Sequence, residues 1–191
     1  LVGSEMCIRD RGWILAFHPD LICGTALGAN IRDYTFFSYR PEEALHISLR
    51  EKQVILELLD KINQELQRCI DCYSQKIISK YIELLLDYCE RFYERQFITR
   101  NEANKQIIGR FNRLLDHHFH TIQSQSADLP TIEDCAGSLH LSPAYFNDLL
   151  EYETGKSFKE YLQFKRFETA KDWLINTDKP LNQLSLIHIS E

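Results

Sequence analysis

The sequence is poor in glycine, has no long apolar run and carries no excess of basic residues. Its 7 glycines in 191 residues disfavour a glycine-rich phosphate-binding architecture. Charged residues interrupt the apolar runs, as in residues 82–86, far short of the ~18 residues that a membrane-spanning helix needs. The net charge of −6 excludes a wholly basic protein that coats nucleic acid. No apolar stretch follows the charges at residues 9–11, so we expect no signal peptide.

The remaining composition is that of a globular chain. Hydrophobic residues make up 44% of the sequence and aromatic residues 12%, which is enough to bury a core. At ~150 residues per domain, the length allows one domain, or one small domain and part of another. The 6 cysteines lie mostly within helix-like patterns, which is typical of reduced thiols. We therefore expect a cytoplasmic protein.

Two short apolar runs near the N-terminal end predict strands or turns. Residues 13–17 (WILAF) and 34–39 (YTFFSY) are rich in aromatic and branched side chains, and Pro19 and Pro41 follow them. Two strands do not fold alone in water. We therefore expect these runs to be the end of a larger domain.

Helical periodicity begins after Pro41 and predicts helices at about 49–68, 75–97 and 103–122. The apolar stripe of the second helix is wider than one amphipathic face needs. Leaving it in water is costly, because burial of each large apolar side chain contributes roughly 1.5–3 kcal/mol. The stripe predicts a dimer interface, with packing inside the chain as the alternative. The predicted interface consists of Ile78, Tyr81, Ile82, Leu85, Tyr88 and Phe92.

A polar linker at 123–128 precedes a dense series of helix start and stop signals. Thr131 and Asp134 form a capping-box-like start, and Ser142 followed by Pro143 suits the start of a second helix. Gly155 is typical of a helix end. Two short helices joined by a turn of this size predict a helix-turn-helix motif.

The capping box at residues 157–160 opens a further helix that runs to about residue 176. About twenty residues at 1.5 Å each span ~30 Å, close to one DNA turn of ~34 Å. Such a helix is long enough to place two reading units in successive major grooves. An ordinary core helix has the same length, so the match is weak by itself.

Several short motifs lie within residues 131–176. They are 141–146 (LSPAYF), 148–150 (DLL), 153–158 (ETGKSF), 160–162 (EYL), Arg166, Ala170, Lys171 and Leu174. In these residues the sequence resembles the first half of the DNA-binding domain of the AraC/XylS family of bacterial transcription regulators. Upstream, 36–39 (FFSY), 43–46 (EALH) and 91–97 (RFYERQF) resemble Bacteroidetes-type members. The resemblance covers about residues 12–183.

The resemblance implies a mainly α fold in which remnant strands of a cupin-like sensor precede dimerisation helices and a homeodomain-like, three-helix helix-turn-helix unit with a long linker helix. It places the end of the sensor at 12–40, the dimerisation segment at 41–100 and the helix-turn-helix unit with its linker helix at 103–183. A second helix-turn-helix is expected to begin near 179–183. Residues 1–11 and 184–191 depart from the family pattern, so we interpret them as non-native ends of a truncated fragment.

The resemblance also implies which residues meet double-stranded DNA. The outward positions of the recognition helix are Ala144, Asn147, Asp148 and Glu151. Asn pairs with adenine, Asp accepts a hydrogen bond from cytosine N4, and Ala contacts the thymine methyl. Phosphate contacts position a protein without specifying sequence. The candidates for these are Ser142, Tyr145, Lys156, Lys159, Lys165 and Arg166.

The sequence therefore predicts a sequence-specific transcription regulator that binds operator DNA as a homodimer. Its effector is unknown, and we expect neither enzymatic activity nor a cofactor. The charge of the C-terminal half opposes DNA binding, because residues 101–191 carry 9 basic and 13 acidic residues. Residues 156–171 are more favourable, with five basic and two acidic residues. The alternative is a helical dimerisation or signalling adaptor that does not bind DNA on its own.

Two patterns raise metal or redox chemistry as weaker alternatives. Cys69 and Cys72 form one CxxC pair without a second, and His117, His118 and His120 cluster near a predicted helix end. We interpret both as ordinary surface features and expect no metal site.

Overall fold

The computed structural model describes residues 13–122 and 129–176, and the chain divides into two compact units. Unit 1 comprises residues up to 34 together with 45–96, and unit 2 comprises 35–44 together with the residues from 97 onward. The predicted non-native ends, the linker at 123–128 and the start of a second reading unit at 179–183 lie outside the described residues.

The described ranges are helical and contain no strand, so the predicted remnant of a cupin-like sheet is wrong. Residues 13–18 have no regular structure, and three short 3₁₀ helices follow: η1 (Pro19–Leu21), η2 (Thr35–Ser38) and η3 (Pro41–Glu43). A five-residue helix, α1 (Ala26–Asn30), lies between them. Branched and aromatic residues favour strands only where a pleated partner is available. Here the backbone groups bond locally instead, as from the Tyr39 N–H to the Phe36 carbonyl. The mainly α class agrees with the structure.

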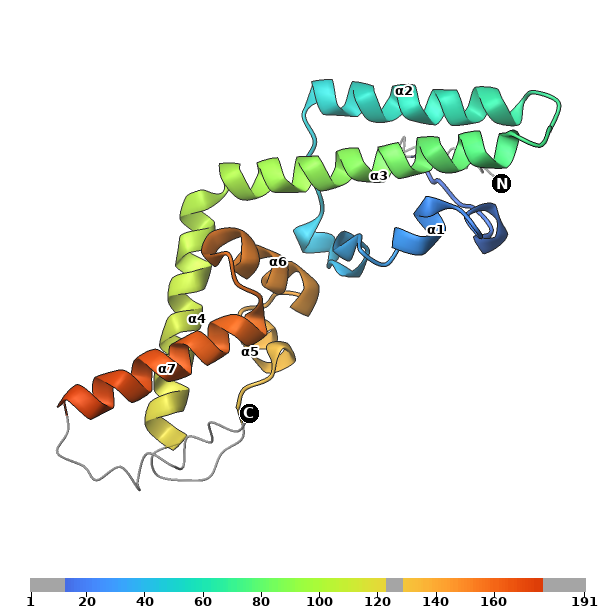
Figure 1. Cartoon of the computed structure of the whole chain (residues 1–191). Coiled ribbons are helices and arrows are strands. Elements are labelled where there is room, and N and C mark those ends of the chain that lie inside the picture. The colour runs from blue at the N-terminus through green and yellow to red at the C-terminus, as the bar shows by residue number, and fades with distance from the viewer. Residues whose placement is uncertain (1–12, 123–128, 177–191) are drawn as a thin grey trace. The chain divides into compact units, whose positions relative to one another are not determined.

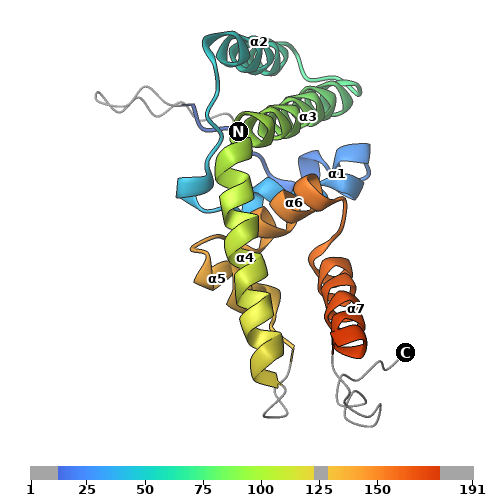
Figure 2. The same ribbon diagram turned by 90° about the vertical axis from the view of Figure 1, so that its left-hand side faces the viewer.

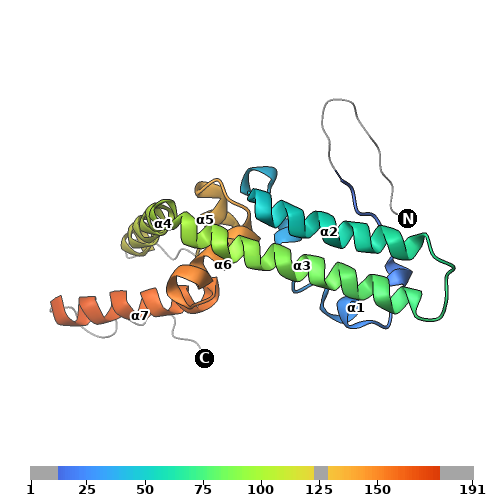
Figure 3. The ribbon, with the colours of Figure 1, turned by 90° about the horizontal axis from the view of Figure 1, so that it is seen from above.

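Unit 1 is built on α2 (Leu49–Leu66) and on residues 74–96 of α3 (Ser74–Thr99), which run side by side (Figures 1 and 3). A capping box between Ser48 and Glu51 starts α2. The same Glu51 carboxylate accepts a hydrogen bond from Arg95 Nε at 2.5 Å, which links the start of α2 to the other helix. Near the start of α3, Ser79 Oγ donates to the Leu21 carbonyl at 3.0 Å and holds the N-terminal segment of the unit.

The residues predicted to form a dimer interface lie mostly inside unit 1. Four of the six, Ile78, Ile82, Leu85 and Phe92, are buried within the single chain, and Tyr81 and Tyr88 are half-buried. Their burial favours the alternative of packing inside the chain. The homodimer itself stays a prediction.

Unit 2 contains α4 (Asn101–Ile122), α5 (Ile132–Ser138), α6 (Pro143–Thr154) and α7 (Phe158–Asn176). Figure 2 shows α5 and α6 beside α4, and α6 contacts α4, α5, α7 and η2. The core forms around Phe111, Phe146 and Leu150, and the Phe111 and Phe146 rings meet edge to face at 4.9 Å. The helix signals read from the sequence are confirmed. Thr131 and Asp134 form a capping box, Ser142 is the N-cap of α6, and Gly155 ends that helix at φ 68°.

We predict that Phe146→Ala lowers the free energy of unfolding of unit 2 by about 3–5 kcal/mol, because it leaves a cavity in a core that solvent does not reach. Amide hydrogen exchange of α4 and α6 across a urea series measures this change. Phe167→Ala is the matched control, since that side chain is 70% exposed and its loss is expected to change stability by less than about 0.5 kcal/mol. Equal effects of the two substitutions would contradict this description of the core.

Candidate nucleic-acid interface

The turn between α5 and α6 sets the direction of the second helix. Leu139 ends α5, and the Leu141 N–H donates to the Ala136 carbonyl at 2.9 Å, so the chain folds back over the end of the helix. His140 has a φ of 59°, a left-handed conformation that His adopts more readily than most residues. Ser142 then accepts from the Tyr145 N–H at 3.2 Å and starts α6. Residues 132–154 thus form a helix, a short turn and a second helix.

The four residues predicted to read bases share one face of α6. Their positions differ by three, four and seven residues, which is the spacing of one helix face. Ala144, Asn147 and Asp148 are half-buried, and Glu151 is exposed. The structure therefore brings these residues together, and their contact with bases stays a prediction.

Asp148 already has hydrogen-bond donors from an earlier part of the chain. Its Oδ2 accepts from the hydroxyl of Thr35 at 2.5 Å and from the hydroxyl of Tyr39 at 2.6 Å. Sequence reasoning missed both donors, because more than one hundred residues separate them from Asp148 and no local pattern marks such a pair.

Asn147 has a structural role that the sequence analysis did not predict. Its Oδ1 accepts from the Phe158 N–H at 3.1 Å, at the first residue of α7. Beside it, Glu160 accepts from the Ser157 N–H at 2.9 Å and from the Ser157 hydroxyl at 2.8 Å. These two hydrogen bonds, of which the one from the backbone N–H has the larger effect, hold the pKa of Glu160 below its usual value. Asn147 and Glu160 together satisfy donors at the start of α7, and the Asn147 amide nitrogen is the part left for a base.

The two candidate phosphate contacts on α6 lie in the interior of unit 2. Ser142 is 3% exposed and donates its N–H and hydroxyl to Glu43 at 2.6 and 2.5 Å. Tyr145 is also 3% exposed and packs between the rings of Tyr39 and Phe97. Burial raises the pKa of the Tyr145 phenol, and the charge and hydrogen bond of Arg100 oppose that rise. Their phosphate contacts stay predictions that require a more open form of the unit.

Of the basic candidates, Lys156 lies just before α7, Lys159 lies in its first turn, and Lys165 and Arg166 lie near its middle. Lys159 is exposed, and Arg166 is half-buried. Lys156 Nζ lies 5.2 Å from the centre of the Phe164 ring, and Lys165 Nζ lies 3.2 Å from the Glu168 carboxylate. These contacts hold the Lys156 and Lys165 side chains close to the helix surface. Lys159 is therefore the lysine best placed to reach outward.

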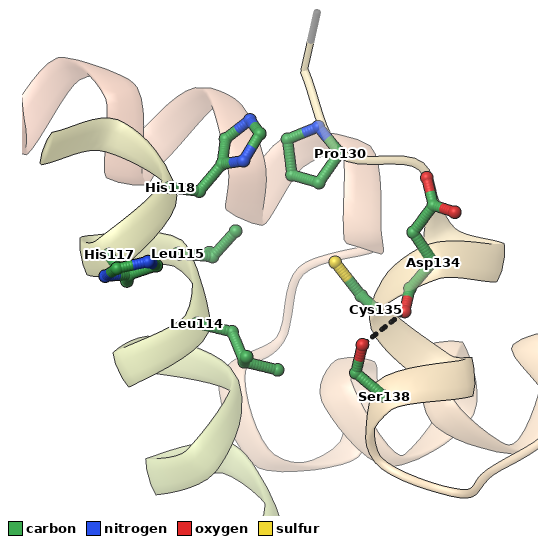
Figure 4. A pocket seen from close by; sticks show the side chains of 8 residues that line it. All are labelled: Leu114, Leu115, His117, His118, Pro130, Asp134, Cys135 and Ser138. Carbon is green, nitrogen blue, oxygen red and sulfur yellow. Dashed lines mark hydrogen bonds between the residues drawn. The ribbon is translucent and has the colours of Figure 1, made fainter. Parts of the chain in front are cut away.

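In the described residues, neither the CxxC pair nor the histidine cluster forms a metal site. Cys69 and Cys72 are exposed, and no group of three metal-ligating side chains occurs in the ranges that the structure describes. His117 and His118 line a cavity of about 370 Å³ between α4 and α5, together with Asp134, Cys135 and Ser138 (Figure 4). Burial raises the pKa of the Cys135 thiol to about 11, so this group is a weak nucleophile and a weak ligand. The side chain of His120 lies outside the description.

Comparisons with known proteins support a helix-turn-helix regulator and nothing finer. No family model matches the chain, and no solved structure matches it. The chain is 26% identical over 98 residues to the "Uncharacterized HTH-type transcriptional regulator YtdP" of Bacillus subtilis (strain 168). The match covers 50% of this chain and 13% of that protein, so the chain spans a small part of its relative. Membership of the AraC/XylS family and of its Bacteroidetes branch stays a prediction. In the described ranges, no helix has both the length and the apolar character to span a bilayer.

We predict that Asn147→Ala destabilises the start of α7 by about 1 kcal/mol, the usual effect of removing a capping acceptor. Asn147→Asp keeps an oxygen at the same position and is expected to preserve the helix. Hydrogen exchange of the Phe158 and Tyr161 amides compares the two variants. If both variants leave the exchange rates of these amides as in the wild-type chain, Asn147 is not the cap.

Proposed function

We propose that this chain is part of a sequence-specific DNA-binding transcription regulator of the AraC/XylS type, in which α6 reads the major groove of operator DNA. The observation that carries the proposal is the α5–turn–α6 motif, in which α6 starts at Ser142 and ends at Gly155, as the resemblance to the family predicts. The similarity to a helix-turn-helix-type transcriptional regulator supports it independently and also disfavours an enzyme.

The reading chemistry follows from the outward face of α6. The Asp148 carboxylate accepts a hydrogen bond from the N4 amino group of cytosine, and the Ala144 methyl contacts a thymine methyl. Asn147 keeps its amide nitrogen as a donor for a base acceptor, because its oxygen serves the start of α7. Glu151, exposed one turn further along, accepts from a second base edge.

Affinity is expected to be low, because the basic residues are few. Phosphate neutralisation supplies most of the affinity of such proteins, and residues 101–191 carry a net negative charge. Lys156, Lys159, Lys165 and Arg166 are the local source of positive charge. We propose that the intact protein adds contacts through a second helix-turn-helix and through homodimerisation, and that its effector acts elsewhere in that longer chain.

We predict that Lys159→Ala weakens the binding of the full chain to every duplex by a similar factor and lowers the slope of log affinity against log salt by about 1. Fluorescence anisotropy with labelled duplexes between ~50 and ~200 mM salt measures both effects. Lys61→Ala, an exposed lysine of α2 in unit 1, is the matched control and is expected to leave both unchanged.

A residue that reads a base is expected to affect the sequence preference and not the salt dependence of binding. Glu151→Ala is expected to change the preferred base at one position of a site selected from randomised duplexes, by about 1–3 kcal/mol, while leaving the salt slope unchanged. Should the full chain bind no duplex even at low salt, the DNA proposal is wrong. Self-association of the chain in that case would favour the adaptor.

A further inference from the structure

Residues 35–44, here called the strap, contact Ser142, Tyr145 and Asp148 at α6, and Asp148 is one of the residues that the proposed function assigns to base reading. The strap comprises η2, η3 and the residues that join and follow them, and η2 contacts α6 directly. Resting on the proposed function, we propose that the strap is an autoinhibitory element, which holds α6 in a closed form and must leave before α6 enters the major groove.

The first support is competition for one side chain. The hydroxyls of Thr35 and Tyr39 both donate to Oδ2 of Asp148. A cytosine amino group requires an acceptor oxygen at this same side chain. Asp148 is half-buried under these donors, so the strap restricts the approach of a base to the remaining acceptor sites of this carboxylate.

The second support is a carboxylate at the place where a phosphate is expected. Glu43 is 4% exposed, and its two oxygens accept the Ser142 N–H and the Ser142 hydroxyl at the first turn of α6. The N-terminus of a helix attracts anions, through its free N–H groups and its dipole. Ser142 is also a candidate phosphate contact, so Glu43 occupies the position of the DNA backbone with an anionic group of its own.

Glu43 also ties this anion to the fold of the strap. Its Oε2 accepts the Arg40 N–H at 2.7 Å and thereby closes η3. Release of Ser142 therefore also loosens the turn that Glu43 closes, and this turn is expected to open more readily once it no longer packs on α6.

The third support is steric. The Tyr39 ring meets the Tyr145 ring edge to face at 5.1 Å and packs on a buried cluster with Phe97 and Leu149. An α-helix with its side chains is about 10–12 Å across, and the major groove is about 12 Å wide. Because α6 alone nearly fills the width of the groove, the strap beside Asp148 and Ser142 leaves too little room for α6 to enter. The strap and a duplex are therefore expected to exclude each other.

The test compares DNA binding by the full chain and by a variant with a weakened strap. Thr35→Val with Tyr39→Phe removes both hydroxyls that bind Asp148 and keeps the side-chain shapes. We expect this double variant to bind duplex DNA about tenfold more tightly than the wild-type chain, because hydrogen bonds to a charged group are the stronger ones. Tyr34→Phe is the matched control. It removes a phenol that donates to Asp87 at 2.5 Å within unit 1, and binding is expected to stay unchanged.

A second measurement needs no variant. The amides of Tyr39, Glu43 and Ala44 donate within the strap, and the amide of Phe146 donates within α6. With saturating duplex, we expect hydrogen exchange in the wild-type chain to become faster at the three strap amides and to stay slow at Phe146. Slow exchange at Phe146 in the double variant shows that α6 remains folded there.

The possible outcomes distinguish autoinhibition by the strap from the proposed DNA binding itself. If duplex binding is retained and Lys159→Ala weakens it, but the double variant binds no more tightly and the strap amides stay protected with DNA, the strap is structural and autoinhibition is wrong. If neither the wild-type chain nor the double variant binds DNA, the proposed function is overturned and the inference falls with it. Tighter binding together with faster strap exchange supports both.

Discussion

The arrangement of unit 2 depends on the buried carboxylate of Glu43 at the first turn of α6. Moving an ionised carboxylate out of water costs several kcal/mol unless polar partners replace the solvent. Here the Ser142 N–H, the Ser142 hydroxyl and the Arg40 N–H supply those partners. The first two belong to the N-cap that starts α6, and the third belongs to the turn that shapes the strap. One side chain therefore joins the start of the candidate reading helix to a segment that lies 99 residues earlier.

α6 contributes both to the core of unit 2 and to the candidate DNA-reading face. Phe146, Leu149 and Leu150 are fully buried and fix the helix against its neighbours, so the outward residues are carried on a rigid element. The outward face is itself partly used for structure, since Asn147 caps α7 and Asp148 holds the strap. In the proposed DNA-bound form only the Asn147 bond is retained, and the rigid positioning that it gives favours discrimination between bases.

The sequence predicted the parts of this structure whose causes are local. The caps at Thr131 and Ser142 and the helix end at Gly155 depend on residues three or four apart, so their pattern is visible in the chain. Residues 34–39 have the composition of a strand, but no neighbouring strand in the described ranges pairs with them, and η2 forms instead. The bonds from the strap to Asp148 and Ser142 connect residues about one hundred positions apart. Periodicity and capping rules carry no information about such pairs.

The division of the chain has a consequence for how the strap acts. The chain passes between the two units at 34/35, at 44/45 and at 96/97, so the strap belongs to unit 2 while both of its ends continue into unit 1. If the strap is autoinhibitory as proposed, such a segment is a tethered competitor of DNA for α6. Its effective concentration at α6 is set by the intervening chain and does not change with the amount of protein in the cell. Any event that changes the end-to-end distance of residues 45–96 would then change the apparent affinity of α6 for DNA. Such an event would need no contact with the DNA or with the strap.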